Sequence, residues 1–247
     1  MMTGVYRIAG RIIEITSLLP DVHEYCREYR ADGVPDIKVS TTQADIDYER
    51  GRSRTADGKT SDGYLEELAV YRRIAESMLC YDTFLFHGSC VSVDGQGYLF
   101  TAKSGTGKST HTRLWREYLG ERAVMVNDDK PLIRADKDGL TVFGTPYNGK
   151  HRLGADISVP LRAVCVIERA ETNRIERIDR AQAYPVILQQ IYRPDDPLLM
   201  QKTLSLADRL AEMPFYRLFC NMDIDAARIS YEGMIQSSPR TIDDLRP

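Results

Sequence analysis

The sequence predicts an α/β fold, and two observations carry that prediction. From residue 84 onward, short apolar runs typical of strands alternate with amphipathic stretches typical of helices. Residues 4–50 instead carry mostly alternating apolar and polar side chains, with one short helical stretch near 22–29. We therefore expect an α/β domain that is preceded by a strand-rich region.

The strand-rich region is predicted to form an N-terminal subdomain over residues 1–63. Apolar residues between positions 5 and 15, and the alternation over 37–48, indicate its strands. The segment GRSRTADGKTSDG (51–63) is polar and mixed in charge, so we expect an exposed loop at the subdomain boundary. The second domain then occupies residues 64–247.

The same periodicities predict the elements of the second domain. Strands are expected at 84–93, 98–101, 123–127, 140–144, 163–169 and 215–220, and helices at 64–79, 108–119, 181–192, 197–213 and 224–235. The helix that starts at Lys108 should end at Gly120, because glycine commonly terminates helices.

Composition limits the partners that the chain is expected to have. The net charge of −3 provides no overall positive field, so neither nucleic acid nor a membrane is expected as a partner. The five cysteines are scattered and form no CxxC pair, which argues against a disulfide framework or a zinc cluster. The N-terminus does not resemble a signal peptide, and no apolar run approaches the roughly 20 residues of a membrane helix. These features predict a cytoplasmic location.

The segment AKSGTGKST (102–110) has the pattern of a phosphate-binding loop. It follows an apolar strand and opens a helix, which is the context that such a loop requires. Glycine at two positions lets the backbone curl so that successive N–H groups face phosphate oxygens. The first position of the pattern is occupied by Ala102, where glycine is usual. Alanine is acceptable there if the residue has a negative φ angle. The residues predicted to bind a nucleotide are Ser104, Gly105, Thr106, Gly107, Lys108, Ser109 and Thr110.

Two adjacent carboxylates follow the next predicted strand. Asp128 and Asp129 come directly after the apolar run 123–127, about twenty residues past the loop. In phosphate-loop proteins, an acidic residue in this position reaches the metal. A pair of carboxylates also allows one of them to act as the general base for the acceptor hydroxyl.

A third element, His87-Gly88, lies on a predicted strand about twenty residues before Lys108. Together, this element, the loop and the aspartate pair resemble the pattern of a known group of enzymes. They are similar to HPr serine kinase/phosphorylase and ATP-dependent phosphoenolpyruvate carboxykinase, which share a nucleotide-binding fold. Order, spacing and residue types agree over residues 84–134. The resemblance implies a mixed sheet that carries the phosphate loop, and the chain looks closest to small peptide-tailoring kinases of the HPr-kinase type.

The resemblance implies a role for each matching residue, with ATP and Mg²⁺ as cofactors. Lys108 and Ser109 would bind phosphate and metal. Asp128 would accept the proton from the attacking hydroxyl, and Asp129 would support the metal. His87 would lie beside the transferred phosphoryl group or the metal, although a lone histidine in a strand is more often a core residue.

The segment GTPYNGKHRLG (144–154) departs from that pattern. HPr kinases carry an acidic metal ligand in the corresponding stretch, and this segment has no acidic residue. It is basic instead, with Lys150, His151 and Arg152. These cations either bind phosphate or an anionic acceptor, or they form a solvated turn.

The predicted function is an ATP- and Mg²⁺-dependent kinase that transfers the γ-phosphoryl group to a Ser/Thr-type hydroxyl of a peptide or protein. The alternatives are a non-catalytic nucleotide-binding module and a kinase of small molecules such as free serine. A carboxykinase-type lyase is disfavoured, because only about 83 residues precede the motif.

Overall fold

The computed structural model describes residues 1–52, 60–149 and 151–236. The chain begins with a three-stranded sheet of β1 (Met2–Ile8), β2 (Arg11–Ser17) and β3 (Ile37–Ser40). β1 and β2 are antiparallel, and β3 adds to β2 in the parallel direction after α1 (Asp21–Tyr25) and a short 3-10 turn. Side chains alternate between buried and exposed along β3, as the sequence pattern predicts for a half-buried strand.

The larger sheet is mixed and has nine strands within the described residues. One run of neighbours is β4-β8-β9-β10-β6-β5-β7, and β12 and then β11 extend the sheet from β10. The long strand β10 lies parallel to β6 and β12 but antiparallel to β9. The strands of this larger sheet are β4 (Thr83–Leu85), β5 (Ser89–Val93), β6 (Gln96–Thr101), β7 (Ala123–Asn127), β8 (Leu132–Asp136), β9 (Gly139–Phe143), β10 (Ser158–Arg169), β11 (Arg174–Ile178) and β12 (Phe215–Cys220).

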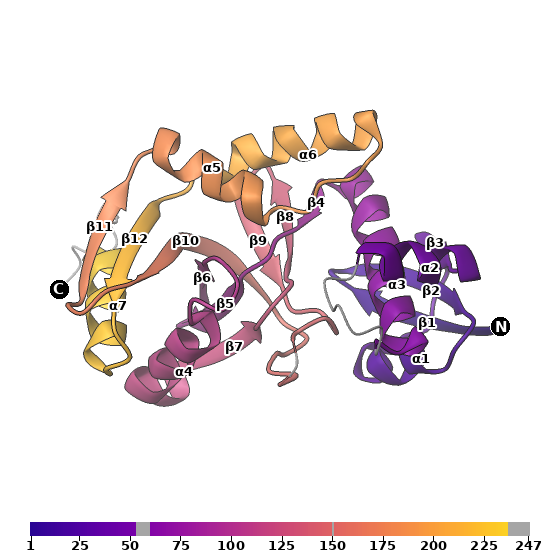
Figure 1. Cartoon of the computed structure of the whole chain (residues 1–247), viewed down its shortest axis with the longest axis horizontal. Coiled ribbons are helices and arrows are strands. Elements are labelled where there is room, and N and C mark those ends of the chain that lie inside the picture. The colour runs from indigo at the N-terminus through magenta and orange to yellow at the C-terminus, as the bar shows by residue number, and fades with distance from the viewer. Residues whose placement is uncertain (53–59, 150, 237–247) are drawn as a thin grey trace.

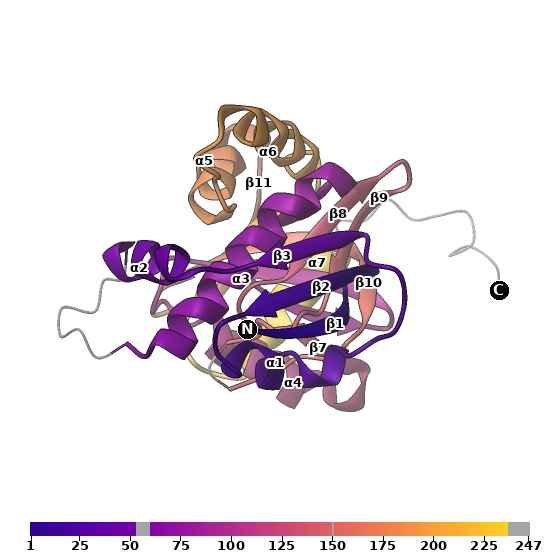
Figure 2. The same ribbon diagram turned by 90° about the vertical axis from the view of Figure 1, so that its right-hand side faces the viewer.

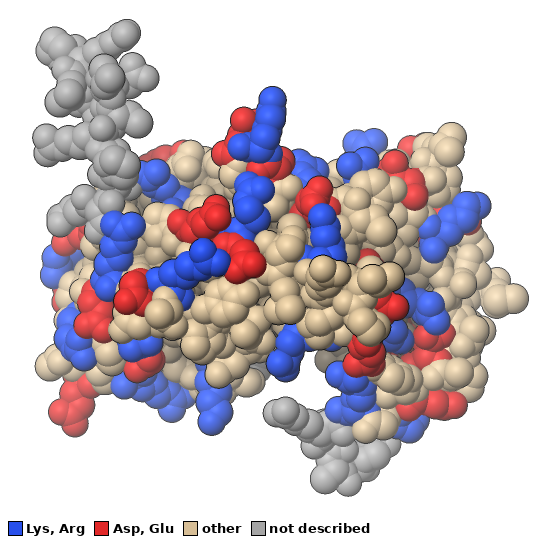
Figure 3. Space-filling view, turned by 90° about the horizontal axis from the view of Figure 1, so that it is seen from above, with Lys and Arg blue, Asp and Glu red and all other residues tan. Residues whose placement is uncertain are grey.

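Helices cover both faces of this sheet (Figure 1). α5 (Arg180–Gln190) and α6 (Pro197–Leu210) lie on one face, and α4 (Lys108–Leu119) and α7 (Asp225–Gln236) lie on the other. The two faces have separate apolar cores, one containing Leu210 of α6 and the other containing Trp115 of α4. Basic and acidic side chains are interspersed on the face seen in Figure 3.

α3 (Asp62–Met78) packs between the small sheet and the large sheet (Figure 2). A third apolar cluster joins Ile13 of β2 and Ile74 of α3 with Leu132 of β8 and Phe143 of β9. The small sheet is therefore packed against the larger one through a shared core.

The α/β class that the sequence predicts is confirmed, but several element predictions are wrong. Residues 43–52 form a helix, α2, where the alternation over 37–48 predicts a strand. Thr42 donates its N–H and its hydroxyl to the carboxylate of Asp45, at 2.9 Å each, and this local pairing starts the helix. The carboxylate of Asp45 also pairs with Arg73 of α3, a tertiary contact that periodicity does not reveal.

Three further differences concern the large sheet. β8 and β11 are strands that the sequence analysis did not predict. The predicted strand at 84–93 is broken, so His87 lies between β4 and β5 and not within a strand. Close packing explains the glycine at position 88, since a Cβ there would meet the carbonyl oxygen of Phe100 at 2.9 Å.

All five cysteines are free thiols, and Cys80 is the exposed one among them. Within the described residues, none of the helices combines the length and the apolar character that crossing a bilayer requires.

Candidate functional site

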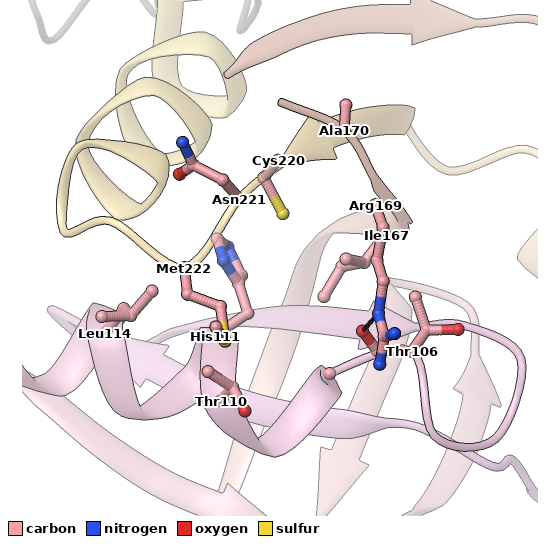
Figure 4. Close-up of a pocket in the computed structure, with 11 residues that line it drawn as sticks. Thr106, Thr110, His111, Leu114, Ile167, Arg169, Ala170, Cys220, Asn221 and Met222 are labelled. Atoms are coloured by element: carbon pink, nitrogen blue, oxygen red, sulfur yellow. Dashed lines mark hydrogen bonds between the residues drawn. The ribbon is translucent and has the colours of Figure 1, made fainter. Parts of the chain in front are cut away.

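The segment between β6 and α4 forms a tight, glycine-dependent loop. Gly105 and Gly107 have φ angles of 79° and 124°, a region that residues with a Cβ rarely adopt. Arg169, at the end of β10, donates from Nε to the carbonyl oxygen of Thr106 at 3.0 Å (Figure 4). Its guanidinium also donates to the carbonyl oxygen of Gly105. α4 begins at Lys108 with no side chain capping its N-terminus, so its first N–H groups remain available to a ligand.

Asn127, the last residue of β7, shapes the turn that carries the two aspartates. Its Oδ1 accepts the N–H groups of Asp129 and Lys130, at 2.9 and 2.8 Å. Its Nδ2 donates to the hydroxyl of Thr145 at 3.0 Å, which ties the turn to the chain beyond β9. The sequence analysis missed this residue, although asparagine at the start of a turn is a recognised signal.

Asp129 lies between two basic side chains. Its carboxylate oxygens are 3.4 Å from Nε2 of His87 and 2.9 Å from Nζ of Lys130. Burial alone would raise the pKa of Asp129, but the contact with His87 and the charge of Lys130 outweigh it and hold the pKa at about 2. Asp129 is therefore ionised throughout the physiological range.

Asp128 has the opposite environment. Burial raises its pKa, and the hydroxyls of Ser89 and Ser109 only partly oppose this shift. Within the part of the chain that the structure describes, its buried Oδ1 has no hydrogen-bond partner. A buried carboxylate oxygen without a partner is costly, so this atom is suited to receive a donor from a ligand.

Lys108 points back along the loop, with Nζ 3.5 Å from the carbonyl oxygen of Ala102. Burial lowers its pKa, while the charges of Asp129 and Asp128 raise it. No hydrogen bond or ion pair to a carboxylate is formed by this ammonium group within the described ranges, so its charge remains available to an anion.

One pocket of about 430 Å³ collects most of the residues that the sequence analysis singled out. It is open to solvent on one side, and its lining combines the loop with the aspartate turn. The predicted residues that line it are His87, Ser104, Gly105, Gly107, Lys108, Ser109, Thr110, Asp128, Asp129 and His151. The roles assigned to them above remain predictions.

Two predicted residues lie elsewhere. Thr106 faces a second pocket, on the other side of the loop. Arg152 lies over the ring of Tyr25, with Cζ 4.5 Å from the ring centroid, and lines a third pocket. Lys150 falls outside the described residues.

The second pocket, of about 390 Å³, is mainly apolar and adjoins the first at Gly107 and Thr110 (Figure 4). Leu114 and His111 of α4 line it from one side, and Met222 lies beyond the end of β12. Burial lowers the pKa of His111 to about 3, so its imidazole is neutral at physiological pH. The sequence analysis did not predict this pocket, because its lining comes from three separate elements.

The first pocket offers oxygen donors that fit Mg²⁺. The hydroxyl of Ser109 and the two aspartates line it together, and hydroxyl and carboxylate oxygens are ligands that this ion prefers. The described residues contain no cluster of three or more His, Cys, Asp or Glu side chains arranged to hold a metal by themselves. Phosphate oxygens and water would have to complete the coordination, as is usual for Mg²⁺ bound with a nucleotide.

Comparison with solved structures gives many matches, among them the HPr(Ser) kinase/phosphatase from Coxiella burnetii. That alignment covers 62% of this chain and 97% of the other, at 10% sequence identity and a TM-score of 0.33. A likeness of this size carries no functional argument, so function has to be inferred from the site itself.

No curated protein matches the chain in a sequence search. Residues 65–221, more than half of the chain, match the model of the family described as SynChlorMet cassette protein ScmC. The chain therefore belongs to the ScmC family.

Proposed function

We propose that this protein is an ATP- and Mg²⁺-dependent kinase that transfers the γ-phosphoryl group to a Ser/Thr-type hydroxyl. The observation that carries the proposal is that one pocket brings three features together. They are the glycine-dependent loop, the ammonium group of Lys108 without a carboxylate partner, and the carboxylates of Asp128 and Asp129, which differ in acidity. Phosphoryl transfer needs these parts, since its catalysis is mostly positioning and charge neutralisation.

The loop and the start of α4 would hold the nucleotide phosphates. Backbone N–H groups and the helix dipole favour an anion at this end of α4, and Lys108 adds a full positive charge toward the β- and γ-phosphates. Mg²⁺, bound by Ser109 and Asp129, would neutralise charge on the transferred group. The low pKa of about 2 suits Asp129 to this task, because a metal ligand has to be ionised.

Asp128 would accept the proton of the acceptor hydroxyl. Its raised pKa brings it closer to the working pH, as an efficient general base requires, and its Oδ1 lacks a partner. His87, 3.4 Å from Asp129, would stabilise the ionised form of that carboxylate. A protein that only binds a nucleotide would need no general base. The presence of Asp128 therefore favours a kinase over a non-catalytic nucleotide-binding module.

The acceptor class that we propose is a peptide or protein hydroxyl. The candidate phosphate pocket is partly open to solvent, so a hydroxyl carried on an extended chain would have access to it. The basic residue His151 lines the same pocket and would contact phosphate or an anionic part of the acceptor.

The test is transfer of labelled γ-phosphate from ATP to small hydroxyl compounds, unstructured Ser/Thr peptides and a folded HPr-like protein. Lys108→Ala should abolish transfer and leave the fold intact, because it removes the ammonium group that faces the phosphates. Lys103→Ala is the matched control, since this exposed lysine of the same loop does not line the pocket. Equal transfer by wild type and Lys108→Ala at saturating ATP contradicts the phosphate-loop assignment.

A further inference from the structure

A separate cavity of about 350 Å³ adjoins the candidate phosphate pocket at Asp129 and Gly149. Its walls come from α1 and α3 at the N-terminal side and from the chain between β9 and β10. Of the residues that the sequence analysis singled out, it shares only Asp129 and Arg152. Because Asp129 lines both spaces, a molecule in this cavity lies next to the atoms proposed for phosphoryl transfer.

Glu67, on α3, gives this cavity an unpaired negative charge. The residue is half-buried, yet no hydrogen bond or ion pair reaches its carboxylate from anywhere in residues 1–52, 60–149 and 151–236. Burial raises its pKa to about 7, against the opposing charge of Arg152, and the charge of Asp21 adds to the rise. The ionised form of a partly desolvated carboxylate without a partner is unfavourable unless a cation binds beside it, and without a cation the group takes up a proton more readily.

The cations of the chain that line the same cavity are engaged elsewhere. Nζ of Lys130 lies 2.9 Å from the carboxylate of Asp129. Arg152 is held over the ring of Tyr25 and has a φ angle of 49°, which a non-glycine residue rarely adopts. Among the described residues neither forms an ion pair with Glu67, although the charge of Arg152 acts on it from a distance, so the carboxylate is free to pair with a cation on a ligand.

Aromatic rings complete a site suited to an ammonium group. Tyr25, Tyr64 and Tyr147 line the cavity, and Tyr147 is stacked on Tyr71 with 3.7 Å between ring centroids, which fixes its orientation. Aromatic faces attract cations, and an ammonium group between a carboxylate and aromatic rings gains from both. The arrangement resembles neither a phosphate site nor a purely apolar pocket.

We propose that this cavity binds the phosphoryl acceptor and that the acceptor carries an ammonium group close to its hydroxyl. The ammonium group binds Glu67 among the tyrosine rings, and the hydroxyl faces Asp128 and Asp129. This inference rests on the proposed kinase function. In the reaction, the acceptor oxygen forms a bond to the γ-phosphorus as the bond to the β–γ bridging oxygen breaks. The proton passes to Asp128, and ADP leaves with the electron pair.

The first experiment measures binding without nucleotide, so it does not depend on catalysis. Ethanolamine is the cationic probe and N-acetylethanolamine is its neutral counterpart, used near pH 8, above the pKa of about 7 of Glu67. We expect ethanolamine to bind at least about tenfold more tightly, a modest value for a hydrogen bond between charged groups. Glu67→Gln should remove this preference, whereas Glu121→Gln, at an exposed acid outside the cavity, should retain it.

Equal binding of the two probes by the wild-type protein, or an unchanged preference in folded Glu67→Gln, overturns the proposal. Melting curves establish that the variant is folded. Lys108→Ala should lose transfer but keep the preference for ethanolamine, which separates failure of the kinase function from failure of the cation site. If ethanolamine binds but no acceptor is phosphorylated, the proposed kinase function is contradicted and only the cation-binding site remains supported.

A second experiment identifies the source of the ammonium group. Labelled ATP is supplied with ethanolamine, with a blocked peptide in which lysine follows serine, or with the same peptide carrying norleucine instead of lysine. Labelling of ethanolamine indicates a small hydroxyamine or a free N-terminus, and labelling of the lysine peptide indicates a basic peptide. Both results support the proposal, whereas equal labelling of the lysine and norleucine peptides, with none of ethanolamine, contradicts it.

Discussion

Asp128 and Asp129 are adjacent in the chain but differ in acidity because their side chains have different neighbours. Asp129 lies within 3.4 Å of His87 and 2.9 Å of Lys130, and its pKa is about 2. Asp128 has no basic group at such a distance among the described residues, and burial raises its pKa. Enzymes that need one ionised and one proton-accepting carboxylate use this kind of difference.

Replacing each aspartate should therefore affect a different step. Asp128→Asn keeps the shape of the side chain and removes the proton acceptor, so turnover should fall by roughly 10²- to 10⁴-fold with ATP affinity little changed. Asp129→Asn should instead raise the Mg²⁺ concentration needed for half-maximal activity. Steady-state rates at varied ATP and Mg²⁺ distinguish these effects. If both variants lose only ATP affinity and keep turnover, the assignment of the base is wrong.

Glu67 should make stability depend on pH. Its pKa of about 7 exceeds the ordinary value of 4.5, so the folded protein binds the additional proton and stability falls as pH rises through this window. Glu67→Gln should be more stable than wild type above pH 7, by on the order of 1 kcal/mol after allowance for solvent screening. The gain should vanish toward pH 4.5. Urea unfolding at several pH values measures it, and a gain that is equal at pH 5 and pH 8 contradicts the assignment.

At the scale of elements, the end of β7 determines where the aspartates lie. Asn127 holds the turn through two backbone N–H groups and joins it to Thr145. Its side chain is fully buried, and its bond to Thr145 is buried as well, whereas the two bonds to the backbone N–H groups are partly buried. The carboxylate pair is thus positioned by a strand end and a side-chain amide, and not by the flexible part of a loop.

Asn127→Ala should reduce activity and stability together. It leaves the N–H groups of Asp129 and Lys130 without their acceptor, which costs about 1–3 kcal/mol for each buried group that stays unsatisfied. The melting temperature in thermal unfolding and the turnover should both fall below the wild-type values, and an unchanged melting temperature would contradict this account.

At the scale of the whole molecule, α3 makes the two sheets share one core. Ile74 is fully buried in the cluster that joins β2, β8 and β9. The cavity that contains Glu67 lies on the same helix, so its shape depends on how α3 packs. The N-terminal region is therefore part of the environment of the candidate site.

Ile74→Ala should destabilise the protein by about 2–4 kcal/mol, because it leaves a cavity in this shared core. Fluorescence of Trp115, the single tryptophan, reports on the face covered by α4. Far-UV circular dichroism reports on all helices and strands, so both signals should change in one transition. Val34→Ala, at a position that is 89% exposed, should change stability by less than about 0.5 kcal/mol. Separate transitions for the two signals would show that the sheets unfold independently.

The sequence predicts what local periodicity and short motifs determine. The helix that begins at Lys108 and the strand that ends before Asp128 are present as predicted. The cavity beside Glu67 could not be predicted, because its lining comes from segments far apart in the chain whose packing has no periodic signature. The helix over 43–52 was missed for a related reason, since Asp45 is held by Arg73 on another helix. The boundary at 63/64 and the site roles remain predictions.

The position of Arg169 has a consequence for the entropy of binding. This side chain already holds the carbonyl groups of Gly105 and Thr106, and it extends from β10, which lies inside the large sheet. A loop that is fixed before its ligand arrives loses little conformational freedom on binding, so more of the interaction energy is retained as affinity. The free loop and the occupied loop should accordingly have nearly the same backbone conformation.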